Sequence, residues 1–85
     1  MSTSPSYQHR ADDLIVTLLS QWLVGTLGNA ELRRAVEEIG TVDLAPGQRS
    51  AVDELIVELR DALPGERADL QMVVRETLES LAYGD

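Results

Sequence analysis

Apolar residues recur every three or four positions along most of this sequence, the spacing that places side chains on one face of an α-helix. Four segments show this pattern, and glycine or proline separates them. They span residues 11–27, 30–39, 46–63 and 66–83. No segment alternates with period two over a useful length, so strands are not expected. The sequence therefore predicts an all-α fold, a compact bundle of four helices joined by short connections.

Residues with known preferences for helix ends give the predicted boundaries. We expect Gly28 to end the first helix, with Gly25 weakening its last turn, and Asn29 to cap the second helix. The other boundary residues are Gly40 at the end of the second helix, Pro46 at the start of the third, Pro64-Gly65 after it, and Gly84 at the end of the fourth.

The chain is long enough for one domain only, since it has 85 residues. Residues 1–9 are rich in serine, threonine, proline and glutamine without periodicity, and they predict a disordered tail. Residues 10–85 form the predicted single helical domain. In a domain of this size, apolar burial and the entropy lost on ordering the chain nearly cancel. The lone monomer is therefore expected to be only marginally stable.

The first helix has an unusually wide apolar surface. Its apolar side chains cover an arc of about 220°, whereas a surface helix usually shows a narrower stripe. One interpretation is that a second chain covers part of this helix, which predicts a homodimer or small oligomer. The alternative is that the other three helices wrap around it. The predicted self-association residues are Leu14, Ile15, Leu18, Leu19, Trp22 and Leu23, with Trp22 either a core residue or an interface anchor.

The other three helices have narrower apolar stripes that suffice for one-sided burial. The predicted core positions are Leu32, Ala35, Val36 and Ile39 in the second helix, Val52, Leu55, Ile56, Leu59 and Leu63 in the third, and Leu70, Val73, Val74, Leu78 and Leu81 in the fourth. Met72 and Tyr83 fall on the opposite side of the fourth helix, where single exposed apolar residues are common.

The charge of the chain limits its partners. Seven arginines and no lysines stand against fifteen aspartates and glutamates, which gives a net charge of −8. Such a surface repels nucleic acid and anionic membranes and attracts a basic protein. The alternative is that the charge only keeps a small protein soluble. The absence of lysine also suggests a bacterial protein from a GC-rich genome, because arginine codons are GC-rich.

The apolar run Leu14–Leu27 is too short and too polar to span a bilayer. Two aspartates precede it, where a signal peptide has positive charge, and no small-residue cleavage motif follows. We therefore expect a cytoplasmic protein.

A row of acidic residues follows helical spacing on the third segment. Glu54, Val57, Glu58 and Asp61 lie on the face away from its apolar stripe, and Glu54 and Glu58 repel each other across one turn. One interpretation is an acidic docking stripe with Val57 as its apolar contact. The alternative is a solvated helix face.

The sequence shows no arrangement of residues that is suited to catalysis or metal binding. His9, the only histidine, lies in the predicted tail, and Ser20, Ser50 and Ser80 have no neighbouring base. The chain contains no cysteine, and the adjacent acidic pairs Glu37-Glu38 and Asp53-Glu54 diverge around their helices. The sequence therefore predicts no enzyme activity, no cofactor and no metal site.

Three functions remain for such a sequence. The first is a helical protein-interaction and assembly module that self-associates and binds another protein. The second is a neutraliser of a basic partner, like an antitoxin or immunity protein. The third is an acyl-carrier-like role, which is disfavoured because Ser50 stands in Arg49-Ser50-Ala51 rather than in the Asp-Ser-Leu motif of those carriers. Salt distinguishes the first two, since charge-steered complexes weaken as ionic strength rises.

Overall fold

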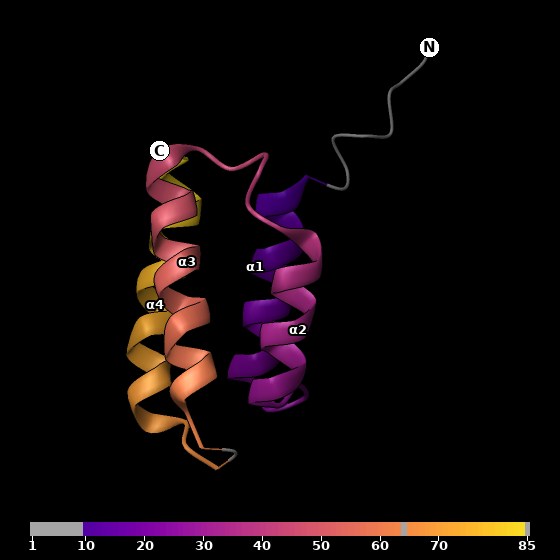
Figure 1. The fold of residues 1–85 in the computed structure, drawn as a ribbon, viewed down its shortest axis with the longest axis vertical. Helices are drawn as coiled ribbons and strands as arrows, with labels where there is room; N and C mark the ends of the chain where they lie inside the picture. Colours follow the sequence, from indigo (N-terminus) through magenta and orange to yellow (C-terminus); the bar gives the residue numbers. More distant parts are fainter. Residues whose placement is uncertain (1–9, 64, 85) are drawn as a thin grey trace.

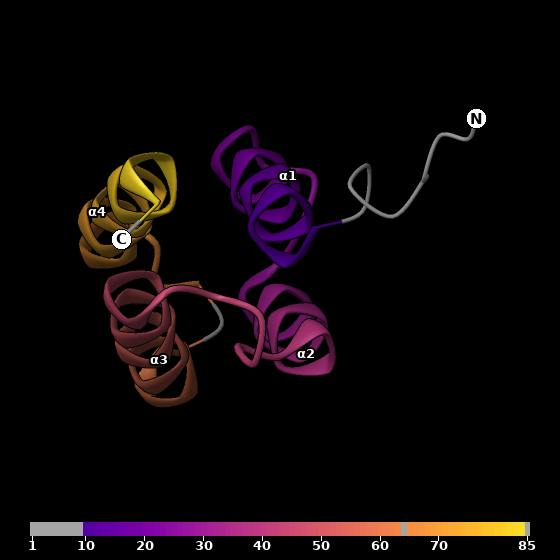
Figure 2. The same cartoon turned by 90° about the horizontal axis from the view of Figure 1, so that it is seen from above.

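The computed structural model describes residues 10–63 and 65–84, and it confirms the predicted all-α fold. Helices α1 (Ala11–Leu23), α2 (Asn29–Ile39), α3 (Pro46–Asp61) and α4 (Ala68–Tyr83) form an up-and-down bundle, and the described residues contain no strand (Figure 1). Viewed from above, the helices occupy the corners of a square (Figure 2). Each helix packs against two neighbours, so that α1 contacts α2 and α4 while α3 contacts the same two helices. The predicted segment 1–9 lies outside the described residues.

None of these helices is long and apolar enough to cross a membrane, within the part of the chain that the structure describes.

Helix α1 ends earlier than predicted. The backbone N–H of Gly25 donates to the Trp22 carbonyl at 3.1 Å, and that of Thr26 donates to the Gln21 carbonyl at 3.0 Å. This pair of bonds is a Schellman motif, with Gly25 at a φ of 90° in the left-handed region. The prediction that the helix continues to Leu27 and ends at Gly28 was wrong, because Gly25 supplies the left-handed residue one turn sooner.

Replacing Gly25 with alanine is expected to lower the free energy of unfolding by about 1 kcal/mol, the cost of a left-handed conformation for an L-residue. A Cβ at this position would meet no atom within 4 Å, so the cost is conformational rather than steric. Gly28→Ala is the control, because Gly28 has a φ of −84°, which residues other than glycine adopt without strain. Urea denaturation measures both variants, and equal effects would contradict this account.

Helix α2 also begins differently from the prediction. Gly28, rather than Asn29, occupies the N-cap position, and its backbone N–H donates to the Glu31 carboxylate at 3.0 Å. Asn29 is the first helical residue, and its side chain points into the protein. The predicted end at Ile39 is correct, with Gly40 following at a φ of 78°.

The third and fourth helices are shorter than predicted. Pro46 begins α3 as expected, but the helix ends at Asp61, and the predicted core residue Leu63 is 68% exposed in the following loop. Helix α4 begins at Ala68 rather than residue 66 and ends at Tyr83, where Gly84 takes the left-handed conformation. The α3–α4 loop is thus longer than the sequence indicated.

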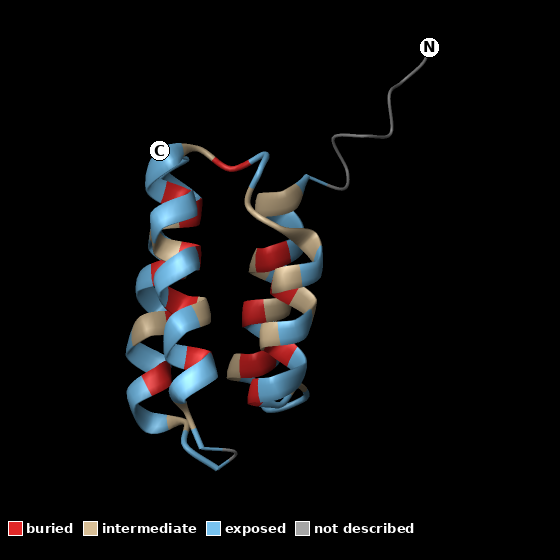
Figure 3. Cartoon of the chain, viewed as in Figure 1, coloured by how far each residue is buried: buried red, intermediate tan, exposed pale blue. Residues whose placement is uncertain are grey.

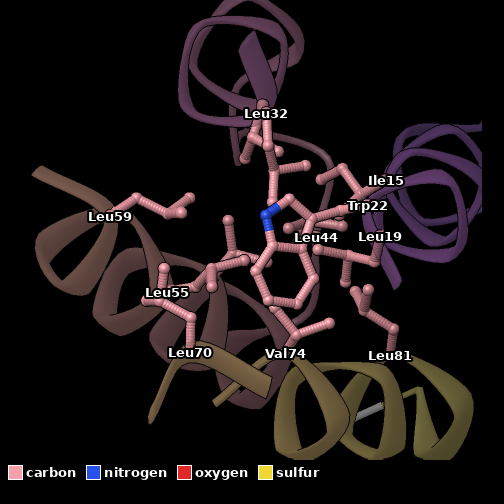
Figure 4. Packing of buried hydrophobic residues seen from close by; sticks show 12 residues of the cluster. Ile15, Leu19, Trp22, Leu32, Leu44, Leu55, Leu59, Leu70, Val74 and Leu81 are labelled. Carbon is pink, nitrogen blue, oxygen red and sulfur yellow. The ribbon is translucent and has the colours of Figure 1, made fainter. Parts of the chain in front are cut away.

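The apolar core runs along the centre of the bundle, and every helix contributes to it (Figures 3 and 4). Leu44, from the α2–α3 connection, covers one end of the core and is only 4% exposed. The buried apolar residues are Ile15, Leu19, Trp22, Leu32, Val36, Leu44, Val52, Leu55, Leu59, Leu70, Val74 and Leu81. The remaining predicted core residues, apart from Leu63, are partly buried. Trp22 is fully buried, which agrees with its interpretation as a core residue.

A polar joint closes the end of the bundle that carries the α1–α2 and α3–α4 loops. Asn29 is 6% exposed, and its Oδ1 accepts a hydrogen bond from Trp22 Nε1 at 2.7 Å. Its Nδ2 donates to the carbonyls of Leu63 at 3.3 Å and Glu66 at 2.9 Å. We call Trp22, Asn29, Leu63, Glu66 and Arg67 the loop-end joint. It binds the α1–α2 hairpin to the loop of the α3–α4 hairpin.

Arg67 completes the loop-end joint. Its guanidinium lies over the Trp22 ring, with Cζ 4.0 Å from the ring centroid, which is a cation–π geometry. The same guanidinium donates to the carbonyls of Trp22 and Leu27, near the end of α1. The Trp22 carbonyl thus accepts from both the Gly25 N–H and Arg67, and the guanidinium places positive charge at the negative end of α1.

Candidate protein-interaction surfaces

The six residues predicted to mediate self-association divide into two groups. Ile15, Leu19 and Trp22 are fully buried within the monomer, so in this fold they cannot contact a second chain. Leu14 is 37% exposed, whereas Leu18 and Leu23 are partly buried. The wide apolar arc of α1 therefore serves mainly the bundle itself, because α1 packs against helices on two sides. Self-association stays a prediction, and of the original set only Leu14 and its neighbour Leu18 line a surface open to a second chain.

That surface is a groove between α1 and α2 with a cavity volume of about 270 Å³. Its apolar floor comes from Leu14 and Leu18 on α1 and from Ala35 and Ile39 on α2. Its rim is formed by Thr17, Gln21 and Glu38. We call these seven residues the α1–α2 groove. The spacing of four residues within each pair keeps the floor on one side of each helix. Glu38 is the one charged residue that lines it.

The predicted acidic stripe is exposed along α3, as the sequence indicated. Glu54, Glu58 and Asp61 are exposed, and Val57 retains 53% of its accessible surface. Val57 also lines a hollow of about 370 Å³ between α2 and α3. That hollow marks the flank of α3 that faces α2. Glu54 and Glu58 lie about 60–100° further around the helix than Val57, and they are therefore on the flank toward α4.

Helix α4 extends the acidic surface with residues that the sequence reading did not connect to the stripe. Two antiparallel helices that share a core turn the same rotational side toward each other. On α3 that side carries Glu54 and Glu58, and the equivalent side of α4 carries Asp69 and Glu76, which therefore face α3. Met72 and Tyr83 lie on the outer side of α4, exposed at 67% and 79%. We call the combined surface the α3–α4 face: Glu54, Val57, Glu58, Asp61, Asp69, Met72, Glu76, Glu79 and Tyr83.

The arginines of α3 and α4 lie elsewhere. Arg60 donates to Glu37 of α2 at 2.8 Å, and the same carboxylate accepts from Arg33 at 3.0 Å. Arg49 reaches the Leu44 carbonyl at 3.4 Å, and Arg75 lies on the flank of α4 toward α1. Arg75 lies one turn before Glu79 at the edge of the α3–α4 face. Among the described residues, the carboxylates on the facing flanks of the two helices, Glu54, Glu58, Asp69 and Glu76, have no arginine among them.

A further hollow lies between α2 and α3. It measures about 410 Å³ and is lined by residues around the start of α2 and the end of α3, including Arg33 and Arg60, both of which bind Glu37. Within the described ranges, no three histidine, aspartate or glutamate side chains are grouped to hold a metal ion. His9 lies outside the described residues.

Compared with protein-family models, curated proteins and solved structures, the chain has no match.

Proposed function

We propose that this chain is a non-catalytic protein-interaction module that binds a basic partner protein through the α3–α4 face. The observation that carries this proposal is the segregation of charge on that face. Its six carboxylates come from two adjacent helices, Arg49 and Arg60 form bonds on the flank of α3 toward α2, and Arg75 lies at the edge of the face beside Glu79. A field of one sign accelerates the approach of an oppositely charged partner and excludes partners of like charge.

The apolar side chains of the same face supply contacts that charge alone does not. Met72 and Tyr83 are the most exposed apolar residues of α4, and Val57 is half-exposed on α3. Aromatic residues and methionine are enriched in protein interfaces, where burial of apolar surface slows dissociation. A basic partner segment with apolar residues at helical spacing fits such a surface.

Charge reversal at two sites tests the proposal. We expect Glu54→Arg/Glu58→Arg to lose the proteins that the wild-type chain captures from its source cell, since the variant places positive charge in the centre of the face. Asp43→Arg/Asp53→Arg is the matched control, because it makes the same change in net charge at exposed residues outside the face. Circular dichroism should show unchanged helicity in both variants.

The comparison between the two variants decides the result. The proposal is supported if the wild type and the control capture the same basic proteins and the Glu54/Glu58 variant does not. Salt at about 0.5 M should release these proteins from the wild type. Capture of the same proteins by all three chains would refute it.

The segregation of charge also favours a second candidate function, the neutralisation of a basic partner. In that case the α3–α4 face covers the surface through which the partner acts. Adding the purified chain should then inhibit the captured partner's own activity, whereas an assembly module leaves that activity intact.

A further inference from the structure

Two opposite faces of the four-helix bundle differ in the signs of their charges. The α3–α4 face carries only carboxylates, whereas the surface around the α1–α2 groove carries Asp13, Glu31, Arg34 and Glu38. A two-fold contact places a surface against its own copy, so that surface must be complementary to itself. A face of one sign repels its copy, and a face of mixed sign can pair with it.

We propose that the surface around the α1–α2 groove binds a second copy of this chain in an antiparallel, two-fold contact. In this arrangement α1 crosses α1 of the second copy, and α2 crosses α2. The contact covers Leu14, which retains 37% of its accessible surface, together with the apolar floor of the groove. The charged residues around the groove sum to −2 on each copy, against −6 on the α3–α4 face, so two copies repel each other less through this surface than through the acidic one.

Arg34 and Glu38 give the contact its register. They lie one turn apart on the outer side of α2, and both are exposed. A two-fold axis that passes between them, perpendicular to the helix, places Arg34 of each copy opposite Glu38 of the other. Within residues 10–63 and 65–84, neither side chain forms an ion pair, whereas Arg33 pairs with Glu37. Both groups are therefore free to bond across the dimer.

The contact is compatible with the proposed function and independent of it. The α1–α2 groove and the α3–α4 face lie on opposite sides of the bundle (Figure 2). A dimer through the groove leaves both acidic faces outward, so the assembly would bind two basic segments at once. Binding of two linked sites strengthens overall attachment without any new contact.

Sedimentation equilibrium of the full chain, from micromolar to millimolar concentration, tests the contact. We expect the wild type to approach twice the 9.3 kDa chain mass. Arg34→Glu and Glu38→Arg should each raise the dimer dissociation constant about tenfold or more, because each sets like charges against each other. The double variant Arg34→Glu/Glu38→Arg should restore the wild-type constant, since it exchanges the two partners.

A second pair of variants tests the apolar part. Leu14→Asp should leave a monomer, whereas Met72→Asp, which adds the same charge to the α4 surface, should still dimerise. A wild-type mass of 9.3 kDa at every concentration would overturn the proposal. So would a double charge exchange that stays monomeric while folded by circular dichroism. Glu54→Arg/Glu58→Arg should not weaken the dimer, which separates this result from the test of the α3–α4 face.

Discussion

Replacing Trp22 with alanine is expected to remove most of the stability of the fold. The side chain is fully buried among the core residues (Figure 4), and truncation of a buried tryptophan costs about 3–5 kcal/mol. It also removes the partner of Asn29 Oδ1 and the ring beneath Arg67. Native domains are stable by roughly 5–15 kcal/mol, and a chain of this length lies toward the lower end. Urea denaturation followed by circular dichroism measures the loss.

Two comparison variants separate the sources of this effect. Trp22→Phe keeps an aromatic ring in the core but loses the Nε1–H donor, and it should cost about 1–3 kcal/mol through the unpaired Asn29 oxygen. Met72→Ala truncates a side chain that is 67% exposed, so it should change the free energy of unfolding by less than about 0.5 kcal/mol. A Trp22→Ala chain as stable as the Met72→Ala chain would contradict the observed core.

Asn29→Ala is expected to have the second largest effect, a loss of about 2–4 kcal/mol. The substitution removes a hydrogen bond from three groups: the Trp22 indole N–H, the Glu66 carbonyl, and the Leu63 carbonyl, which still accepts from the Glu66 N–H. Because two of these belong to the α3–α4 loop, we expect the loss to appear locally as well. Amide hydrogen exchange should accelerate around residues 65–67 more than in the middle of α3.

A double-mutant cycle tests whether Asn29 acts through Trp22. Combining Asn29→Ala with Trp22→Phe should cost less than the sum of the single variants, by about 0.5–3 kcal/mol, since both remove the same hydrogen bond. If the losses in unfolding free energy are additive, Asn29 does not act through Trp22. If hydrogen exchange in the α3–α4 loop is unchanged in Asn29→Ala, the loop-end joint does not hold the hairpins together.

The role of Asn29 shows where sequence reading fails. Asparagine after glycine is a good N-cap, and local preference alone supports that assignment. In the structure Gly28 takes the cap position because the Asn29 amide has partners that are distant in sequence, at Trp22, Leu63 and Glu66. Gln48 was overlooked for the same reason, since its Nε2 donates to the Leu81 carbonyl, which is 33 residues away. Buried hydrogen bonds between distant segments leave no local pattern.

Helical periodicity was informative where a single apolar face decides the structure. It predicted the four helices and nearly all of their core positions, because burial requires apolar residues on one side of each helix. It was less informative for α1, where the wide arc is compatible with two neighbouring helices or with a second chain. It also predicted an exposed acidic stripe on α3, but the contribution of α4 depends on which flank of α4 faces α3. That arrangement is set by the tertiary packing.

The loop-end joint gives the protein a built-in optical probe. Trp22 is the only tryptophan of the chain, so all indole emission originates where the two hairpins meet. A buried indole emits at shorter wavelength than a hydrated one, and opening of the joint would hydrate the ring and remove the guanidinium above it. Fluorescence therefore follows separation of the hairpins, whereas circular dichroism follows the helices. If the emission shifts before the helical signal is lost, the hairpins separate as folded units.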